Sequence, residues 1–480
     1  MRPVAWLRWA SLLLLVTSAQ PCPQGCDCIM WDVFCSEEGL AAVPLDIPLN
    51  ATSIVFVETS FSTVGTRAFH GSPNLTKVVF LNAQLFHLKP DAFGGLPRLE
   101  DLEITGSSFS SLNADIFPEE LFHPLASLQT LKLSSNALSG LPEGVFDKLG
   151  SLQELFLDNN VISKLPARLF SRLRSLEQLW LQHNAIAHLP RTAFSSLRNL
   201  TFLSLQGNAL QTLPEDLFAA TPSLAALSLS HNRLETVAEG TFANLSRLTS
   251  LTLSHNAITH LPADVFRDLK ELVRLYLGSN NLTVLHPNLF QNLSNLELLS
   301  LSKNLLTTVP EGVFDTNYNL FNVALHGNPW QCDCRLAYLS SWLQQYSDRL
   351  FNIQTYCAGP AYLKGQMVPA LEQRQLICPV TRDRLGYQAP GLEDWELGSP
   401  WDLVAEERVA RSRCTFSNPE GTVVLACDEA RCRWLSIQLS SRQGSGIPGL
   451  AYNASQEWDL KSSCGSIRVT VSLEALAGDA

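Results

Sequence analysis

The sequence predicts an α/β-type repeat solenoid, with a parallel β-sheet on the concave face, an irregular convex side and a disulfide cap at each end. Three columns of residues support this, because asparagine, leucine and phenylalanine each recur at one constant period through the middle of the chain. Nine consecutive matches make a chance pattern negligible. The asparagine column consists of Asn136, Asn160, Asn184, Asn208, Asn232, Asn256, Asn280, Asn304 and Asn328.

One unit runs from Leu152 through Leu155 and Leu157 to Asn160 and reaches its phenylalanine at Phe170, which is the leucine-rich-repeat pattern. The Leu-x-Leu core predicts a short strand that pairs with its neighbours, with leucines pointing inward and the residues beside them pointing outward. The asparagine amide is expected to satisfy buried backbone groups in its own turn and in the next one. The phenylalanines are expected to stack as a spine under the convex side.

The repeats span residues 51–327 as about 12 units, of which the first three carry Thr59, Ala83 and Ser107 in place of asparagine. Their spine residues are predicted to be Phe69, Phe93 and Phe117. The step from Ser107 to Asn136 is five positions longer than the period, so the phase slips near residues 117–122. One interpretation is a single longer repeat that bulges on the convex side, and the other is a join at which whole repeats are missing. We favour the join, and expect Phe122 to hold the spine position more convincingly than Phe117.

Charge and the first residues bear on the compartment and on the class of partner. The 480 residues carry a net charge of −11 without any basic run, which argues against a nucleic-acid partner. Residues 1–21 have the charged, apolar and small-residue regions of a signal peptide. No later apolar run is long enough to span a bilayer, so membrane insertion is not predicted. We expect a secreted, extracellular protein.

Twelve cysteines lie in three groups, which predict the domain boundaries. Residues 22–50 and 328–380 are predicted to be cysteine caps that cover the two ends of the solenoid, followed by a linker at 381–412 and a small β-rich disulfide domain at 413–480. Spacing alone would allow metal ligation, but a secreted chain favours disulfides. The last group allows three connectivities. The three groups are Cys22, Cys26, Cys28 and Cys35; Cys332, Cys334, Cys357 and Cys378; and Cys414, Cys427, Cys432 and Cys464.

Seven Asn-x-Ser/Thr sequons predict a glycoprotein, and none of them uses a ladder asparagine. They are Asn50, Asn74, Asn199, Asn244, Asn281, Asn292 and Asn453.

No catalytic motif is present, so the chain is predicted not to be an enzyme and to need no cofactor or metal. His183, His231 and His255 share one repeat position, immediately before the ladder asparagine. They could form a metal-binding or pH-sensing strip, but solvated turn residues are the favoured interpretation.

The outward strand positions predict a protein-binding surface. Phe156, Trp180 and Phe202 fall on three successive strands and form an apolar cluster with a polar border, which is typical of a binding hot spot. The alternative is that these side chains only pack against one another. The predicted site residues are Phe156, Trp180, Phe202, Tyr276, Glu154, Gln178, Asp158 and Gln182.

The repeat block, the stretch Tyr356-Cys-Ala-Gly-Pro-Ala-Tyr362-Leu-Lys-Gly365 and the stretch Asn453-Ala-Ser-Gln-Glu-Trp458-Asp-Leu resemble the regulatory subunits of carboxypeptidase N. The two stretches carry the specificity, since many extracellular proteins share the repeats and caps. Similarity of the caps to those of extracellular leucine-rich-repeat proteins implies the pairs Cys22–Cys28, Cys26–Cys35, Cys332–Cys357 and Cys334–Cys378.

The resemblance implies a noncatalytic plasma glycoprotein that binds and stabilises a zinc carboxypeptidase subunit, with two copies of each in the complex. It also implies longer family members with extra repeats where the phase slips. The alternative function is a soluble recognition protein for another extracellular ligand, of an innate-immune or hormone-carrier type.

Overall fold

The computed structural model describes residues 22–107, 109, 117–346 and 354–378, together with the backbone of five strands beyond residue 400. The chain divides into two compact units, Met1–Cys378 and Pro379–Ala480, and each is described by itself.

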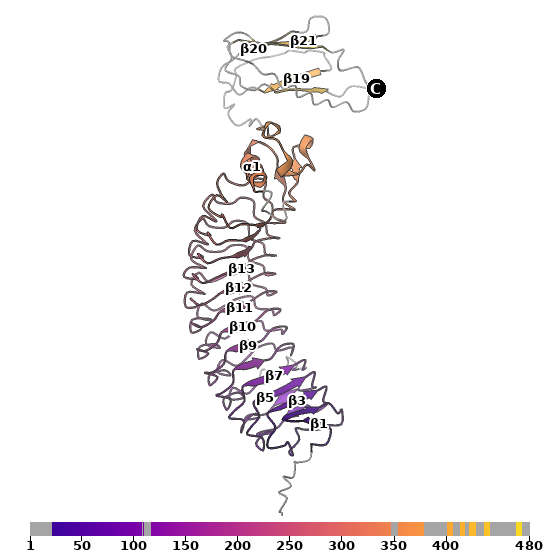
Figure 1. Ribbon diagram of the computed structural model, residues 1–480, viewed down its shortest axis with the longest axis vertical. Helices are drawn as coiled ribbons and strands as arrows, with labels where there is room; N and C mark the ends of the chain where they lie inside the picture. Colours follow the sequence, from indigo (N-terminus) through magenta and orange to yellow (C-terminus); the bar gives the residue numbers. More distant parts are fainter. Residues whose placement is uncertain are drawn as a thin grey trace, which may run out of the picture. The chain divides into compact units, whose positions relative to one another are not determined.

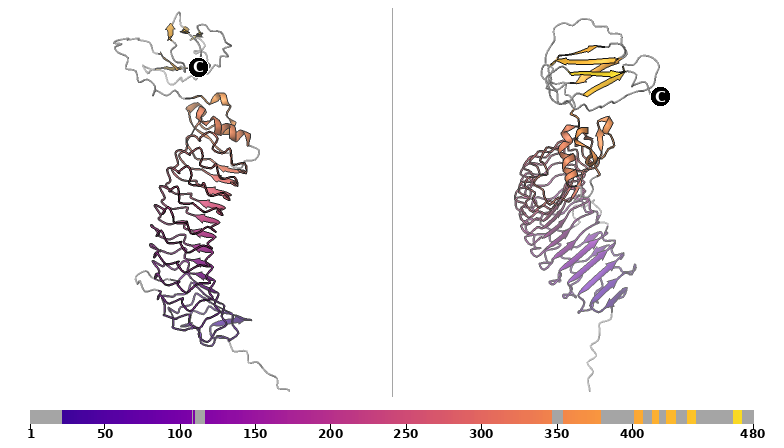
Figure 2. Two further views of the ribbon diagram at one scale, coloured as in Figure 1. Left: turned by 90° about the vertical axis from the view of Figure 1, so that its left-hand side faces the viewer. Right: turned by 45° about the horizontal axis from the view of Figure 1, so that its top comes forward.

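A 14-stranded sheet runs the length of the first unit, with its strands side by side along one side of the stack (Figure 1, Figure 2). β1 and β2 are antiparallel, and all the other neighbouring strands are parallel. The outward side of this sheet is called the concave face below. The strands are β1 (Cys26–Ile29), β2 (Asp32–Cys35), β3 (Ser53–Val57), β5 (Lys77–Leu81), β7 (Asp101–Thr105), β8 (Thr130–Lys132), β9 (Glu154–Phe156), β10 (Gln178–Trp180), β11 (Phe202–Ser204), β12 (Ala226–Ser228), β13 (Ser250–Thr252), β14 (Arg274–Tyr276), β15 (Leu298–Ser300) and β16 (Asn322–Ala324). A separate parallel pair, β4 (Thr63–Val64) and β6 (His87–Leu88), lies outside it.

Strand register follows the sequence period and its one interruption. Lys77 pairs with Asp101 and Thr130 with Glu154, each one period apart, whereas Asp101 pairs with Thr130 across the longer step. β7 and β8 are nevertheless direct neighbours, so the slip lies outside the sheet. Residues 108 and 110–116 of the connecting segment fall outside the described residues.

The phenylalanine column forms the predicted spine. Its rings are buried and stack at centroid distances such as 6.1 Å between Phe194 and Phe218. At the slip, Phe122 stacks on Phe93 at 6.2 Å, as expected. The prediction that Phe117 belongs to the spine is wrong, because it packs edge-on against Phe122 at 5.9 Å. The five additional residues move Phe117 out of the stacking position.

The asparagine column forms a hydrogen-bonded ladder. The Asn184 amide donates to the carbonyl oxygens of Leu181, in its own turn, and of Leu157, in the preceding repeat. Its oxygen accepts from the N–H of Ile162, also in the preceding repeat. The prediction that the amide reaches the next turn is therefore wrong in direction, because the side chain points back toward the N-terminal neighbour.

The first three repeats lack this ladder. The hydroxyls of Thr59 and Ser107 are buried without a partner among the described residues, so they do not replace the asparagine. The strands of these repeats have five residues, against three in β8, so more of their backbone is paired within the sheet.

Both ends of the solenoid carry disulfides. The bonds Cys22–Cys28 and Cys26–Cys35 staple the β1–β2 hairpin, and Cys332–Cys357 and Cys334–Cys378 close the other cap. These are the pairs implied by the resemblance to extracellular caps.

The C-terminal cap is built around one helix and several short elements. The helix α1 (Ala337–Gln345) places Trp342 against Phe314, with ring centroids 4.9 Å apart, so that the indole covers the end of the spine. The other elements are β17 (Trp330–Gln331), β18 (Cys357–Gly359) and the 3-10 turns η1 (Cys334–Leu336), η2 (Ala361–Leu363), η3 (Val368–Ala370) and η4 (Gln373–Gln375).

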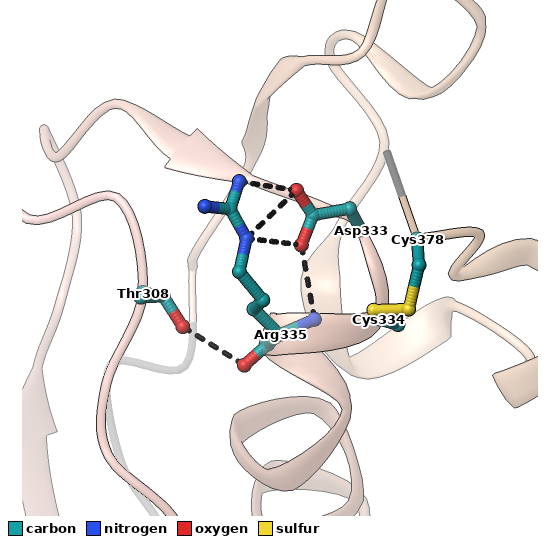
Figure 3. The surroundings of a disulfide bond; sticks show 5 residues. All are labelled: Thr308, Asp333, Cys334, Arg335 and Cys378. Carbon is teal, nitrogen blue, oxygen red and sulfur yellow. Dashed lines mark hydrogen bonds and ion pairs between the residues drawn. A yellow bond between two sulfur atoms is a disulfide. The ribbon is translucent and has the colours of Figure 1, made fainter. Parts of the chain in front are cut away.

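A charged pair holds the start of this cap beside the Cys334–Cys378 bond (Figure 3). The Asp333 carboxylate accepts from the backbone N–H of Arg335 at 2.9 Å and from its guanidinium at 2.6 Å. Thr308, in the last repeats, donates its hydroxyl proton to the Arg335 carbonyl at 2.8 Å. The cap is thereby tied to the repeat block by polar contacts as well as by packing.

The second unit contains two antiparallel groups of strands, β20-β21-β23 and β19-β22. β19 lies inside the segment predicted as a linker at 381–412, so that part of the prediction is wrong. Cys414 and Cys427 are opposite each other in the register of β20 and β21, whereas Cys432 and Cys464 lie outside the described residues. The strands are β19 (Trp401–Glu406), β20 (Arg413–Ser417), β21 (Thr422–Asp428), β22 (Ser436–Ser441) and β23 (Ile467–Ser472).

Candidate protein-binding surface on the concave face

The concave face is formed by the residues on either side of each strand's central residue. In β8 to β10 and in β12, β13, β15 and β16 the central residue is buried and its two neighbours are partly exposed. Successive side chains of a strand point to opposite faces, so the leucines enter the core while their neighbours face outward. Exposure on this surface is thus set by the same alternation that builds the core.

Phe156, Trp180 and Phe202 form one cluster on β9, β10 and β11. The Phe156 and Trp180 rings are nearly parallel with centroids 5.5 Å apart, and the Phe202 ring lies 4.1 Å from Trp180. All three side chains remain partly exposed. The rings therefore pack against one another and still offer apolar surface to a partner, so the two interpretations of the sequence are compatible.

Polar groups border the cluster on β9 and β10 and just after these strands. The Glu154 carboxylate accepts from the Gln178 amide at 3.2 Å, and Asp158 accepts from the Ser134 hydroxyl at 2.6 Å. The Trp180 indole N–H and the Gln182 carbonyl oxygen are buried without a partner among the described residues. Each unpaired buried polar group lowers the stability of the fold.

Tyr276 is a predicted site residue outside the aromatic cluster, and it lies on β14, four strands or roughly 19 Å from β10. One expectation about this face needs correction. Ser204, an outward position by register, is only 5% exposed. Its register partner is Trp180, whose indole leans over toward Phe202 on the strand of Ser204. A large side chain covers its small neighbour, which strand alternation alone does not reveal.

A second apolar group, on the N-terminal strands, is not among the predicted site residues. Ile29 and Phe34 on the β1–β2 hairpin lie 61% and 39% exposed. The register places Phe34 beside Val55 of β3 and Val55 beside Val79 of β5. The sequence could have predicted this second apolar group, because the outward positions of the first two repeats include aliphatic residues instead of polar ones.

The sequons avoid the concave strands. None of the six sequon asparagines within the described residues falls in a strand of the 14-stranded sheet, and Asn453 lies outside the described part of the chain. Asn199 is exposed and donates its amide to the Arg174 carbonyl at 3.1 Å. Glycans at these positions would leave the strand surfaces themselves unmodified.

The histidine column brings only two of its members together. The His231 and His255 rings stack with centroids 4.1 Å apart. Burial, and then the nearby charges of His231 and Lys303, lower the pKa of His255 below its usual 6.5. Within the described residues, no three histidine, cysteine or acidic side chains are grouped so that they could hold a metal ion. The column therefore contributes one stacked pair of rings.

No helix in the described part of the chain is long and apolar enough to cross a membrane.

Two curated relatives match about a third of the chain. Carboxypeptidase N subunit 2 from Homo sapiens is 72% identical over 162 residues, covering 34% of this chain and 29% of that protein. The Mus musculus protein of the same name is 62% identical over 162 residues, covering 34% and 30%. The matched stretch thus spans less than a third of the length of these relatives.

Solved structures share the fold at low sequence identity. A Toll–Spatzle complex from Drosophila superposes with a TM-score of 0.58 at 23% identity, covering 69% of this chain and 49% of that chain. The mouse RP105/MD-1 complex gives a TM-score of 0.54 at 20% identity, covering 71% and 54%. Both likenesses concern the fold alone.

The family model for leucine rich repeats matches overlapping segments at 73–138, 113–162, 126–186, 152–210, 174–234, 222–282 and 270–329. Together these segments cover more than half of the chain and coincide with the ladder, the spine and the parallel sheet. The chain therefore belongs to the leucine-rich-repeat family.

Proposed function

We propose that this chain is a secreted, noncatalytic regulatory subunit that binds and stabilises the zinc carboxypeptidase subunit of plasma carboxypeptidase N, with two copies of each in the complex. Two findings support the proposal. Relatives named carboxypeptidase N subunit 2 are 72% and 62% identical over 162 residues. The concave face carries an aromatic cluster with a polar border, an arrangement typical of a protein-binding hot spot.

The aromatic cluster is the main support for placing the binding site on the concave face. Trp180 lies at its centre, in contact with Phe156 on one side and Phe202 on the other. Large aromatic side chains at the centre of a partly exposed apolar patch contribute most of the binding energy in many interfaces. The described sequons lie outside these strands, so glycosylation is compatible with a partner on this face.

The proposal is tested by capture of a basic carboxypeptidase from plasma on the immobilised secreted chain, followed by an assay for release of C-terminal lysine or arginine. Trp180→Ala should weaken the binding by about 2 kcal/mol or more, which is roughly thirtyfold in the dissociation constant. Tyr318→Ala is the matched control, because Tyr318 is a 77% exposed aromatic side chain that lies outside the strands of the concave face.

Stability of the same variants separates the possible results. A lower melting temperature with unchanged binding would mean that the rings of the cluster only pack against one another. If neither binding nor stability changes, the concave cluster is not the site, and the segment 413–480 becomes the next candidate. Capture of no basic carboxypeptidase by the unmodified chain would refute the proposed function and favour a recognition protein for another extracellular ligand.

A further inference from the structure

The N-terminal end of the concave face carries an apolar surface distinct from the aromatic cluster. On the β1–β2 hairpin, Ile29, Met30 and Trp31 are 61%, 88% and 55% exposed, and Phe34 is 39% exposed. The hairpin register places Ile29 opposite Asp32 and Phe34 opposite Asp27. The side chains of these two pairs therefore share one face of the hairpin. Cys35, on the other face, is fully buried.

This surface continues onto the next strands. Phe34 is the register neighbour of Val55, and Val55 of Val79, while Val57 pairs with Leu81. Burial alternates along β3, with Ile54 and Phe56 in the core, so Val55 and Val57 point outward. Val79 is covered, at 3% exposed, and the side chains around it remain accessible. The N-terminal cluster is defined as Ile29, Met30, Trp31, Phe34, Val55, Val57, Val79 and Leu81.

The turn that carries the most exposed residues departs from local preference. Met30 has φ 56°, in the left-handed region that favours glycine, asparagine or aspartate in a tight hairpin. Methionine and tryptophan occupy the two turn positions instead. Both choices work against folding, because one strains the backbone and the other leaves apolar surface in water. Local violations of this kind are expected where a surface serves binding.

The cluster lies in a strongly acidic part of the chain. Residues 22–66 contain six acidic residues and no lysine, arginine or histidine. Asp27 and Asp32 lie directly on the hairpin face, and neither forms an ion pair with another described residue. The nearest lysine on the sheet, Lys77, is paired with Asp101 at 2.7 Å. The charge on this surface is therefore uncompensated.

We propose that the N-terminal cluster is a docking surface for a protein partner that presents apolar side chains bordered by lysine or arginine. The negative charge of this surface favours such a partner over two other possible occupants, a second copy of the chain and an anionic lipid surface. A second copy of the chain would bring the same carboxylates together, and an anionic lipid surface would be repelled by them. A basic partner gains from the charges while it buries the apolar residues.

This surface is separate from the site of the proposed function. Val55 and Trp180 lie five strand spacings apart, roughly 24 Å. The ion pairs Lys77–Asp101 and Lys132–Glu103 lie between them on the concave face. The two surfaces can therefore be tested independently, and failure of one proposal does not affect the other.

The test uses the full secreted chain from mammalian cells and two immobilised peptides, an amphipathic peptide of leucine and lysine and its counterpart of leucine and glutamate. The lysine peptide should bind and the glutamate peptide should not, with affinity that falls as salt is added. Trp31→Ala should weaken binding about tenfold. Ile377→Ala, which removes a 47% exposed apolar side chain in the other cap, should leave binding unchanged.

Two further variants test the same surface. Asp32→Asn should weaken binding a few-fold and flatten its salt dependence. If Trp31→Ala fails to fold, Met30→Ser serves instead, because that side chain is 88% exposed and contributes little to the core.

The proposal is overturned if both peptides bind equally, or if Trp31→Ala (or Met30→Ser in its place) binds like the unmodified chain. Self-association in sedimentation that disappears in Trp31→Ala would assign the surface to a second copy instead. Binding to phosphatidylcholine vesicles that disappears in the same variant would assign it to lipid.

Discussion

Removal of one ladder amide should destabilise the solenoid by an amount that the hydrogen bonds allow us to estimate. Asn208 is 9% exposed, and its oxygen accepts the backbone N–H of Ile186 at 3.0 Å. Its amide group donates to the carbonyl oxygens of Leu181 at 2.9 Å and Leu205 at 3.1 Å. Asn208→Ala removes all of these bonds, but the consequences for the backbone groups differ.

Both carbonyls keep another donor. The Leu181 oxygen also accepts from Asn184, and the Leu205 oxygen also accepts from Asn232. The Ile186 N–H has no other acceptor among the described residues. The variant therefore leaves one buried donor unpaired, which costs about 1–3 kcal/mol of unfolding free energy, and not the sum of the bonds removed.

The effect is measured as the shift of the urea or thermal unfolding midpoint. Gln211→Ala is the matched control, since it removes an amide side chain that is exposed in the same repeat. Ser204→Ala is a poor control, because Ser204 is only 5% exposed. Equal midpoints for Asn208→Ala and Gln211→Ala would refute the argument that the amide satisfies buried backbone.

Three other substitutions probe separate features. Thr59→Val should leave stability unchanged or raise it, because the Thr59 hydroxyl is buried without a described partner; a lower urea midpoint would contradict this. His255 has a folded-state pKa below 6.5, so it binds its proton more readily when unfolded, and its contribution to stability should fall as pH drops below 6.5 through the folded pKa. His231→Ala should raise the His255 pKa in an NMR titration, and an unchanged value would show that the stacked ring has no effect. Tyr338→Phe should cost about 1–3 kcal/mol, because the Phe314 N–H loses its acceptor at 3.0 Å, and an unchanged melting temperature would mean that water replaces the hydroxyl.

Periodicity alone predicted the solenoid, because each column of this repeat has a single structural role. Leucines such as Leu155 and Leu179 pair in register and are fully buried, and Phe194 stacks on Phe218 as the phenylalanine column requires. The aromatic cluster followed from the same rule, because strand alternation fixes which side chains face outward. The constant period then brings Trp180 beside Phe202 and Phe156.

The remaining features depend on side-chain size and direction, which a period does not contain. The column pattern could not place Phe117, because that choice depends on how five additional residues are accommodated beside the spine. Burial of Ser204 follows from the size of Trp180 on the neighbouring strand. To predict the N-terminal cluster, strand alternation has to be applied to the first repeats, which lack the asparagine column. The pairing of Phe34 with Val55 must also be known, and the repeat period does not contain it.

The longer step between Asp101 and Thr130 has a consequence for how the chain can change length. Each repeat of a solenoid contacts only its neighbours, so its stability is approximately a sum of local terms. β7 and β8 pair although the connection between them departs from the period and the asparagine ladder begins beyond it, at Asn136. A change in repeat number at this seam would break the β7–β8 interface and form new interfaces between neighbouring repeats, while the contacts within both caps would be unchanged. The span of the concave face, and with it the distance between its two apolar clusters, would then vary independently of the stability of either end.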